Sequence, residues 1–415
     1  MPSRKTETEV LRRILDVARK LAVTPDLGAL LRMIVDATCD VLACERATIF
    51  LYDKEADELY SRVATGDRQI RFPAGRGVAG AAAKQRVIVN VPDAYADERF
   101  NREIDRKTGF VTRNLLTFPL ENLSGDLIGV LQALNKHDRP FDAKDEDLAR
   151  TLAAQAGVAL DRGRLIEEYA DKQRMARDLH IARSIQQQLF PKRPPNVPGY
   201  DVCGWNRSAD ETGGDCYDFV PLEDGRLAVI LADASGHGVG AALVIAQCRS
   251  ILRAMLSVTR DLSRIASGAN TLLCEDLSDE RFVTAFVGLL DPRAHVIDYV
   301  SAGQGPLLLV SSDGAESRSA NGLPLAVLPD IEAGPPARFE LPPGSTLALL
   351  TDGFFETLGA DQQQYGEERL ANFIRTRSRA TLSDLIAALH ADVCAFAAGQ
   401  PQADDLTAVL IRRQG

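Results

Sequence analysis

Four prolines follow a helical stretch near the middle of the chain, and they separate two regions with different apolar patterns. The stretch "RLIEEYADKQRMARDLHIARSIQQQLF" ends at Pro191, Pro194, Pro195 and Pro198. Proline cannot continue a helix, because it lacks the N–H donor and clashes with the preceding turn. A chain of 415 residues also exceeds what one hydrophobic core usually supports. We therefore expect an N-terminal domain at 10–165, a connector helix at 166–195 and a C-terminal domain at 196–415.

Composition narrows the functional classes. The net charge of −10 gives no electrostatic support for nonspecific binding to nucleic acid or to an anionic membrane. The start, "MPSRKTETEV", contains no apolar signal, and nowhere do 18 apolar residues run together, so we expect a cytosolic protein. Seven cysteines without a CxxC pair argue against a disulfide framework and a zinc site. Most are expected to be small core residues, and Cys216 stays open as a redox-sensitive thiol.

Helical and strand-like patterns alternate in the N-terminal region. Amphipathic helices are predicted around residues 11–18 and at 27–41. The segments "RATIFLYD", "ELYSRVA", "NLLTFPL" and "LIGVLQALN" are typical of strands, and a closing helix is predicted to begin near Asp145. This region groups no catalytic residue types.

The N-terminal region resembles a GAF domain along almost its full length. The likeness is carried by "GRGVAG", "NVPDAYADERFN", "DRKTGFVTRN" and "IGVLQALNK", and by the NKFDE signature Asn135, Lys136, Phe141, Asp145 and Glu146. It implies an antiparallel sheet with flanking helices and a small-molecule sensor, with a cyclic nucleotide as one candidate ligand. By the same resemblance, Thr108 and Thr112 lie on the loop that lines the pocket. A structural interpretation stays open, in which Asn135 and Lys136 cap a strand while Asp145 and Glu146 start a helix whose N-terminus favours acids.

The predicted connector carries an apolar seam. Its members recur at spacings of 4, 3, 4 and 3, namely Met175, Leu179, Ala182, Gln186 and Leu189. A mean spacing of 3.5 keeps one seam facing a partner helix. Two interpretations remain, a dimer-forming coiled coil continuous with the last helix of the first domain, or a helix packed on its own C-terminal domain.

In the C-terminal region, four apolar runs end at or begin after an aspartate. Asp215 follows Gly213 and Gly214, whose freedom at positive φ permits a sharp turn. The other three positions are Asp233 after Leu227–Ala232, Asp352 after "TLALLT", and Asp404 with Asp405 before the last strand-like run. Strand pairs mixed with segregated helices predict an α+β domain or a layered αββα domain. Carboxylates at strand ends on one edge of a sheet suit hard divalent cations such as Mg²⁺ and Mn²⁺, and four of them can hold two metals.

This region resembles the SpoIIE/RsbU-type branch of the PPM serine/threonine phosphatases from residue 175 to the end. The motifs "GGDCYDF", "DASGHG", "TDGFFE" and "DDLTAVL" follow the family order. The resemblance implies metal ligation by Asp215, Asp233, Asp352, Asp404 and the Ala234 carbonyl. It also places Asp218 and Asp405 where they orient water or the ligands. His237, in "GHG", is a candidate proton donor to the leaving serine oxygen, or is simply held in the turn between two glycines.

The sequence departs from the phosphatase family pattern at two points, and one of its motifs also fits another class of protein. Gln304 stands in "SAGQGP", where the family often has histidine, and the sequence shows no arginine dedicated to the substrate phosphate. The pair Gly213–Gly214 before Asp215 also fits the turn of a GGDEF nucleotide cyclase or an ordinary tight turn. A cyclase would need an acidic residue directly after this aspartate, where Cys216 stands, and the later aspartate motifs would go unused.

The sequence therefore predicts a Mn²⁺- or Mg²⁺-dependent protein serine/threonine phosphatase, regulated by a GAF sensor through a helical connector. In the family, the usual substrate is a phosphoserine on an anti-anti-sigma factor of the STAS type. We expect a homodimer with no nucleic-acid or membrane partner. The alternative is a catalytically silent dimeric scaffold that uses the phosphatase fold to hold a partner.

Overall fold

The computed structural model describes residues 4–61, 70–277, 281–329 and 333–415. The chain divides into two compact units, Met1–Arg174 and Met175–Gly415. The division falls inside the long helix α5 (Ala143–Gln187), which runs through residue 165 without a break. The boundaries predicted at residues 165 and 196 stay predictions.

The first unit is built on a six-stranded antiparallel sheet with strand order β3-β2-β1-β6-β5-β4. The strands are β1 (Cys44–Asp53), β2 (Glu58–Tyr60), β3 (Arg71–Pro73), β4 (Val89–Val91), β5 (Leu115–Glu121) and β6 (Leu127–Lys136). Three of the four predicted strands are long and central. The fourth, "ELYSRVA", yields only the short β2, and its residues 62–64 lie outside the described residues.

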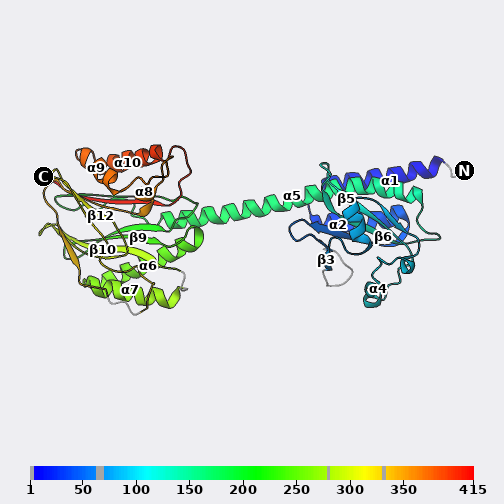
Figure 1. Cartoon of the computed structure of the whole chain (residues 1–415), viewed down its shortest axis with the longest axis horizontal. Coiled ribbons are helices and arrows are strands. Elements are labelled where there is room, and N and C mark those ends of the chain that lie inside the picture. Colours follow the sequence, from blue (N-terminus) through cyan, green and yellow to red (C-terminus); the bar gives the residue numbers. More distant parts are fainter. Residues whose placement is uncertain (1–3, 62–69, 278–280, 330–332) are drawn as a thin grey trace. The chain divides into compact units, whose positions relative to one another are not determined.

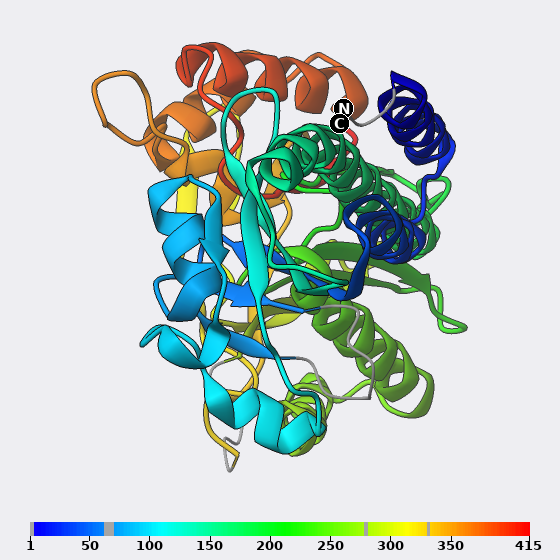
Figure 2. The ribbon, with the colours of Figure 1, turned by 90° about the vertical axis from the view of Figure 1, so that its right-hand side faces the viewer.

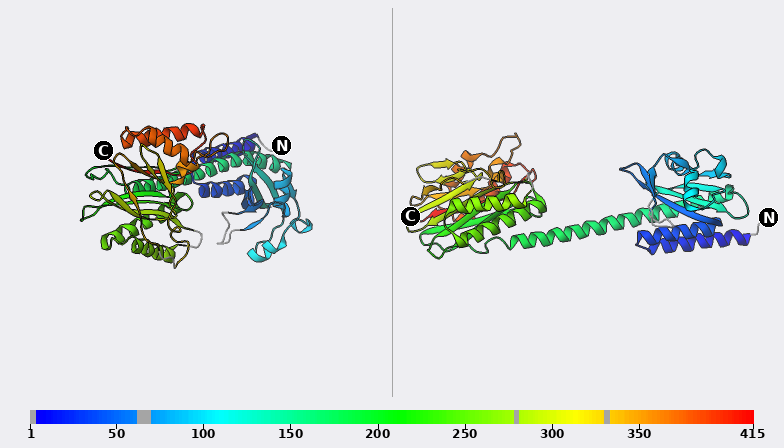
Figure 3. Two further views of the ribbon diagram at one scale, coloured as in Figure 1. Left: turned by 60° about the vertical axis from the view of Figure 1, so that its left-hand side comes forward. Right: turned by 90° about the horizontal axis from the view of Figure 1, so that it is seen from below.

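Helices cover both faces of this sheet. On one face lie α1 (Arg4–Val23), α2 (Leu27–Leu42) and the start of α5 (Figures 2 and 3). The apolar side chains of these helices share one core with β1, β5 and β6. Asp26 caps α2, because its carboxylate accepts a hydrogen bond from the N–H of Ala29 at 2.6 Å. The other face packs against α3 (Gly77–Gln85). The 3₁₀ turn Ala94–Ala96 and α4 (Arg102–Thr108) stand in the segment between β4 and β5.

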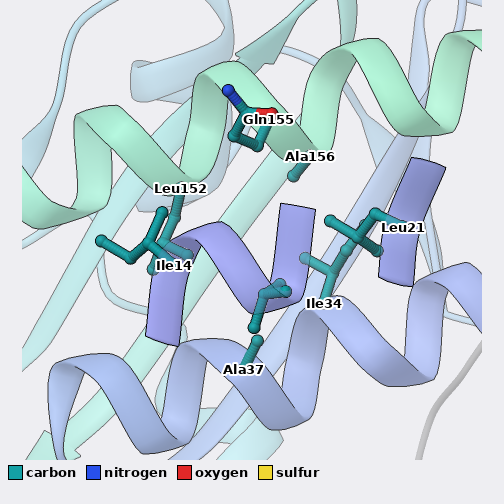
Figure 4. A pocket seen from close by; sticks show the side chains of 8 residues that line it. Ile14, Leu21, Ile34, Ala37, Leu152, Gln155 and Ala156 are labelled. Carbon is teal, nitrogen blue, oxygen red and sulfur yellow. The ribbon is translucent and has the colours of Figure 1, made fainter. Parts of the chain in front are cut away.

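The three helices on the first face close tightly on one another. Figure 4 shows the side chains that point into the space between them, Ile14 and Leu21 from α1, Ile34 and Ala37 from α2, and Leu152, Gln155 and Ala156 from α5. The remaining gap is about 10 Å³, which is room for about one water molecule. This space is therefore a packed core and not a ligand pocket.

The second unit contains two five-stranded antiparallel sheets. Their strand orders are β14-β11-β10-β9-β8 and β13-β12-β15-β16-β7. The strands are β7 (Tyr200–Arg207), β8 (Asp215–Pro221), β9 (Leu227–Ala234), β10 (Val283–Asp291), β11 (Val296–Ala302), β12 (Leu307–Val310), β13 (Ala315–Arg318), β14 (Ala337–Glu340), β15 (Thr346–Leu350) and β16 (Leu406–Arg413). The strands β7, β8, β10, β13 and β14 were not predicted from the sequence.

Helices cover the outer faces of the two sheets, so the unit has four layers (Figures 1 and 3). On the first sheet lie α6 (Gly238–Val258) and α7 (Leu262–Asp276), and on the second lie α8 (Asp352–Glu356), α9 (Glu367–Thr376) and α10 (Leu382–Phe396). One hydrophobic core fills the space between the sheets, and one core lies under each helical layer. The predicted αββα arrangement is confirmed. Among the described helices α6 alone is long and apolar enough to cross a membrane, a property that it shares with core helices.

Candidate functional site

Two of the predicted aspartates face each other across neighbouring strands. Asp215 begins β8 and stands directly opposite Asp233 in β9. Residues directly opposite in an antiparallel pair project their side chains to the same face of the sheet. The Asp215 side chain is 2% exposed, and the two carboxyl groups lie within hydrogen-bonding contact. Strand pairing therefore forces two acidic groups together in the interior.

The glycine pair before Asp215 has a different function from the one predicted. Neither Gly213 nor Gly214 has a positive φ, so the expectation of a left-handed turn is wrong. A Cβ on Gly213 would lie 2.2 Å from a carboxylate oxygen of Asp405, and one on Gly214 would lie 2.8 Å from the carbonyl oxygen of Ala234. These glycines are needed because other groups approach the backbone closely.

Two threonines from the second sheet fix the Asp215 carboxylate. Its Oδ2 accepts hydrogen bonds from the hydroxyls of Thr351, at 2.8 Å, and Thr407, at 2.6 Å. The Thr407 N–H in turn donates to the Thr351 hydroxyl at 3.0 Å. Neither threonine was singled out in the sequence, although each stands beside a predicted aspartate, in "TDGFFE" and "DDLTAVL". A hydroxyl in an otherwise apolar strand end was the available signal.

The other predicted ligands come from the second sheet. Asp352 follows β15 as the first residue of α8, and Asp404 precedes β16. Both interact electrostatically with Asp233, which belongs to the first sheet. The acidic cluster therefore lies where the ends of two facing sheets meet, and not on one edge of a single sheet as the sequence predicted.

The cluster shows strong mutual repulsion. Burial and the neighbouring Asp233 and Asp405 raise the pKa of Asp215 well above its ordinary value. Burial, Asp352 and Asp404 raise the pKa of Asp233 to about 7. Burial and Asp404 also raise the pKa of Asp352. Among the described side chains no lysine or arginine forms an ion pair with any of these groups, so the cluster lacks a positive charge.

The chemistry of the donor set fits hard divalent cations, because it consists of carboxylate oxygens, with the Ala234 carbonyl beside Gly214. The described residues nevertheless contain no three acidic, histidine or cysteine side chains already spaced to hold a metal ion. The predicted ligands are thus neighbours that have not closed around a common centre.

The two aspartates predicted to support the ligands lie in different places. Asp405 is buried, and its carboxylate accepts hydrogen bonds from the N–H groups of Ala209, at 2.7 Å, and Asp215, at 3.3 Å. It therefore holds the segment that leads into β8. Asp218 lies three residues after Asp215 and so on the opposite face of the strand. Its carboxylate pairs with two arginines of α6, Arg249 at 2.9 Å and Arg253 at 2.6 Å, and the structure does not bring it to the cluster.

Three further residues discussed in the sequence have clear positions. His237 is the N-cap residue of α6, and its Nδ1 lies 3.1 Å from Asp210. Gln304 is buried, where its amide accepts a hydrogen bond from the Thr284 hydroxyl at 2.9 Å and donates to the Leu350 carbonyl at 3.0 Å. Gln304 therefore braces β15 just before Asp352. Cys216 is fully buried, and burial raises the pKa of its thiol well above the ordinary value, which argues against a redox-sensitive thiol there.

The end of α5 contacts the segment that introduces the cluster. Gln186 donates from Nε2 to the carbonyl of Gly213 at 2.6 Å and accepts from the Gly213 N–H at 3.1 Å. Its side chain is buried. Phe190 packs beside it against Tyr217 of β8, with ring centroids 5.2 Å apart. Gln186 was predicted to lie on a seam that faces either a partner helix or its own C-terminal domain, and at this residue the structure agrees with the second interpretation. Leu189 stands beyond the end of the helix.

An open groove of about 810 Å³ begins at α8, the helix that carries Asp352. Its lining includes Glu356 of α8, Tyr365, and the acidic pair Glu367 and Glu368 of α9. Arg369 also lines the groove, so its wall is mainly but not wholly acidic.

In the first unit, the GAF motif residues contact one another. The Thr112 hydroxyl donates to Asp105 at 2.9 Å, and the Thr112 N–H donates to the same carboxylate at 2.7 Å. Asn135 accepts a hydrogen bond from the Arg113 N–H and donates to Glu45 and to the Val111 carbonyl, at 2.7, 2.8 and 2.8 Å. The signature thus clamps the loop at residues 111–114. Thr108 ends α4, and its side chain lies outside the described residues.

The other signature residues anchor α5. Asp145 and Glu146 lie in its first turn, as the structural interpretation of the motif predicted. Lys136 pairs with Asp145 at 2.9 Å, and both side chains are buried. Glu146 accepts a hydrogen bond from Asn90 at 2.9 Å. The motif therefore joins β6 and β4 to the start of this helix.

Comparisons with known proteins agree with both architectures. The family model "Stage II sporulation protein E (SpoIIE)" matches residues 223–414, which include Asp233, Asp352 and Asp404 but not Asp215. The GAF domain model matches residues 26–160. The solved structure "SiaA-PP2C domain of Pseudomonas aeruginosa" is 23% identical and covers 59% of this chain and 98% of that chain, with a TM-score of 0.52. At that identity the likeness shows the fold alone.

Two curated relatives are similar over shorter stretches. The "Probable 3',5'-cyclic phosphodiesterase pde-5" of Caenorhabditis elegans is 34% identical over 170 residues, 37% of this chain and 23% of that protein. The "Dual 3',5'-cyclic-AMP and -GMP phosphodiesterase 11A" of Takifugu rubripes is 30% identical over 166 residues, 36% of this chain and 18% of that protein. The chain spans less than a quarter of the length of these relatives. Taken with the two sheets and their helical layers, these matches show that the chain joins a GAF domain to a domain of the SpoIIE family, which has the PP2C phosphatase fold.

Proposed function

We propose that the second unit is a metal-dependent phosphatase that removes phosphate from serine or threonine in a protein. The observation that carries the proposal is the meeting of Asp215, Asp233, Asp352 and Asp404 from two facing sheets. Burial and mutual repulsion raise the pKa values of the first three. A same-sign cluster in a folded interior calls for a counter-charge. Two cations, Mn²⁺ or Mg²⁺, held by these aspartates and the Ala234 carbonyl, supply that charge.

When bound, such ions polarise the phosphoryl group and activate water for in-line attack. The chain's own residues position the ligands. Thr351 and Thr407 orient the Asp215 carboxylate, and Asp405 fixes the backbone that leads to it. We assign His237 as the proton donor to the leaving serine oxygen, since histidine titrates near neutral pH and this side chain is exposed at the start of α6.

The proposed substrate is a phosphoserine on an anti-anti-sigma regulator of the STAS type, in the cytosol. The support is the resemblance of the motifs to the SpoIIE/RsbU branch and the family match over residues 223–414. The groove beside Asp352 is open enough to accept a protein surface and not only a small ester. Its mainly acidic wall, which includes Glu367 and Glu368, favours basic side chains near the phosphoserine.

We further propose that the GAF domain regulates this site through α5. Gln186 in its last turn holds Gly213, which lies two residues before Asp215, so a shift of the helix moves the segment that carries a ligand. A typical coupling of about 1–3 kcal/mol changes activity about 5- to 150-fold. The proposed input is a small molecule such as a cyclic nucleotide, for which Thr108 and Thr112 are the candidate contacts. Because Thr112 is already bonded to Asp105, a ligand would have to compete with that contact.

A homodimer through α5 is also proposed. The helix exposes large apolar side chains to solvent, namely Leu165, Ile166, Tyr169, Met175, Ile181 and Ile185. These residues do not all lie on one face, and a partner helix from a second copy would cover those in register with the predicted seam, Leu165 and Met175. Since Gln186 is buried in its own domain, the paired stretch must end before it.

Phosphate release by the full chain tests the enzymatic proposal. We expect Mn²⁺-dependent release from a phosphoserine protein and from an aryl phosphate, lost with excess chelator and in Asp215→Asn and Asp352→Asn. Calorimetric titration with Mn²⁺ provides a readout apart from turnover, and the variants should bind it more weakly. Among the residues that the structure describes, no three donors converge, and this favours the rival, a catalytically silent scaffold. Equal, negligible turnover and equal Mn²⁺ binding in all three proteins would establish that rival.

A further inference from the structure

Two cysteines of the GAF domain meet at the junction of α2 and β1. Cys39 lies in the last turn of α2, and Cys44 is the first residue of β1. Between them Ala43 has a left-handed conformation, φ 48° and ψ 58°, and its N–H donates to the Cys39 carbonyl. This tight turn folds Cys44 back against the helix, with its sulfur 4.0 Å from the Thr38 carbonyl oxygen. The Cys44 sulfur also lies 3.5 Å from the Arg46 carbonyl oxygen, and the two cysteine side chains interact with each other.

The two thiols are unequal. Cys39 is half-buried and Cys44 is 4% exposed. The hydrogen bond from the Cys44 thiol lowers the pKa of Cys39, against the opposing effects of burial and of Asp36 and Asp40. The same hydrogen bond, together with burial, raises the pKa of Cys44. Cys39 therefore has the features of an attacking thiol, and Cys44 those of a resolving thiol beside it.

Three other cysteines in the described part of the chain, Cys216, Cys248 and Cys394, lack this combination. Cys216 and Cys248 interact with each other but are fully buried, which keeps an oxidant away. Cys394 is exposed, and its sulfur lies 3.3 Å from Nε2 of His390, with no thiol partner among the described residues. Accessibility and a second thiol coincide at Cys39.

We propose that Cys39 and Cys44 form a peroxide-reactive dithiol that closes reversibly to a disulfide. The Cys39 thiolate attacks one oxygen of a hydroperoxide, the O–O bond breaks, and the leaving oxygen departs as hydroxide or alkoxide that takes up a proton. Cys39 is left as a sulfenic acid. The Cys44 sulfur then attacks the Cys39 sulfur, the S–O bond breaks, and water leaves with the Cys44 proton. The two sulfurs lose two electrons, which reduce the peroxide.

The position of the dithiol connects it to α5. Lys136 donates from Nζ to the Leu42 carbonyl at 2.8 Å, and the His137 N–H donates to the Ala43 carbonyl at 3.0 Å. Lys136 also pairs with Asp145 in the first turn of α5. Drawing the Cys39 and Cys44 sulfurs into a bond displaces the turn that carries these carbonyls. Oxidation therefore loosens the contact of Lys136 and the start of α5, an effect independent of the proposed phosphatase activity.

One tryptic peptide reports the reaction. Cleavage after Arg32 and Arg46 releases "MIVDATCDVLACER", which contains both cysteines and no other. After equimolar hydrogen peroxide on the full chain, this peptide should be two hydrogens lighter and resist alkylation until dithiothreitol is added. Cys44→Ser should stop at a sulfenic acid on Cys39 that a 1,3-dione reagent traps, and Cys39→Ser should leave Cys44 unmodified. Cys394→Ser serves as the matched control and should react like the parent.

The rate of cysteine oxidation and the effect of oxidation on α5 are measured on the same samples. We expect Cys39 to react about 10-fold faster than the exposed Cys394, and amide hydrogen exchange in residues 145–150 to rise on oxidation and return on reduction. Full alkylation of both cysteines after peroxide would overturn the proposal. So would a Cys44→Ser protein that melts like the parent yet gives no trapped sulfenic acid at Cys39. Unchanged exchange at the start of α5 in the verified disulfide form would overturn the coupling.

Discussion

The GAF domain and the phosphatase domain treat their charged motif residues in opposite ways. In the GAF domain, buried Lys136 pairs with Asp145, and the Asn135 side chain forms hydrogen bonds with the backbone of the neighbouring loop. In the phosphatase domain, Asp215 and Asp233 face each other, and no described basic side chain pairs with either. The first arrangement stabilises the fold by itself. The second lowers stability until something positive is added, which is typical of residues kept for function.

The strongest way to test this difference is to remove one carboxylate from the acidic cluster. Asp352→Asn should reduce phosphate release from a phosphoserine protein by about 10³-fold or more, because each metal supplies several kcal/mol of transition-state stabilisation. Asp313→Asn, an exposed residue in the turn between β12 and β13, is the control and should retain activity within about threefold. A variant at Asp352 that keeps the parental rate would remove this residue from the proposed ligand set.

In the GAF domain, the largest expected effect is on stability. Asp145→Asn leaves Lys136 buried without its counter-charge, which costs about 3–5 kcal/mol when a buried pair is broken. Calorimetry of the full chain should show the unfolding transition of the GAF domain shifted to lower temperature. The transition of the phosphatase domain, and its stabilisation by Mn²⁺, should be unchanged. The exposed Asp147, in the same turn of α5, gives the control Asp147→Asn, which should lie within about 0.5 kcal/mol of the parent. Equal effects from both substitutions would contradict the assignment of Asp145 as a buried structural charge.

In the phosphatase domain, replacing an aspartate by asparagine should raise the free energy of unfolding instead of lowering it. The pKa of Asp233 is raised from 3.8 to about 7, so the folded state binds more protons than the unfolded state between these values. Stability of the metal-free protein therefore falls as the pH rises from about 4 through about 7. Asp233→Asn removes this loss and should stabilise the chelator-treated domain by about 1–4 kcal/mol at pH 8.

Two measurements check the predicted stabilisation by Asp233→Asn, its dependence on pH and its response to Mn²⁺. The advantage of Asp233→Asn should be smaller at pH 5, where much of the parental carboxyl is already protonated. Saturating Mn²⁺ should reverse it, because the parent gains binding energy that the variant lacks. Melting temperatures of the parent and of Asp233→Asn between pH 5 and pH 8 test this prediction. A destabilised variant at pH 8 without metal would show that the carboxylate is not repelled by its neighbours.

Much of the fold was predictable because the apolar runs are bounded by Gly, Pro and Asp. The runs before Asp233 and Asp352 gave β9 and β15, and the helix patterns gave α6, α7 and α10. The strand β8 was missed because its polar residues hide the alternation of apolar and polar positions. For the same reason, the opposite orientations of Asp215 and Asp218 were not predicted. A recognised strand would have placed them on different faces, because they are three residues apart.

Other features depend on contacts that no local pattern contains. Gly213 and Gly214 are required by atoms of Asp405 and Ala234, which are distant in sequence, so their φ values could not be inferred from the glycines alone. The thiols of Cys39 and Cys44 meet through the left-handed turn at Ala43, a spacing outside the CxxC pattern. Gln186 fitted the heptad seam, and only tertiary structure shows that its amide is used by Gly213.

The smallest expected effect concerns this contact between α5 and the phosphatase domain. Gln186→Ala removes two hydrogen bonds and leaves the Gly213 N–H and carbonyl without their partner, which costs about 1–2 kcal/mol. If this energy holds the segment before Asp215 in its active position, phosphate release should fall about 5- to 30-fold, while Mn²⁺ at high concentration recovers part of the loss. Gln187→Ala changes the same residue type one position on, where the side chain is exposed, and should behave like the parent. A Gln186→Ala protein with parental kinetics at every Mn²⁺ concentration would mean that the helix is attached to the domain without influencing its site, and the route from the sensor would have to lie elsewhere.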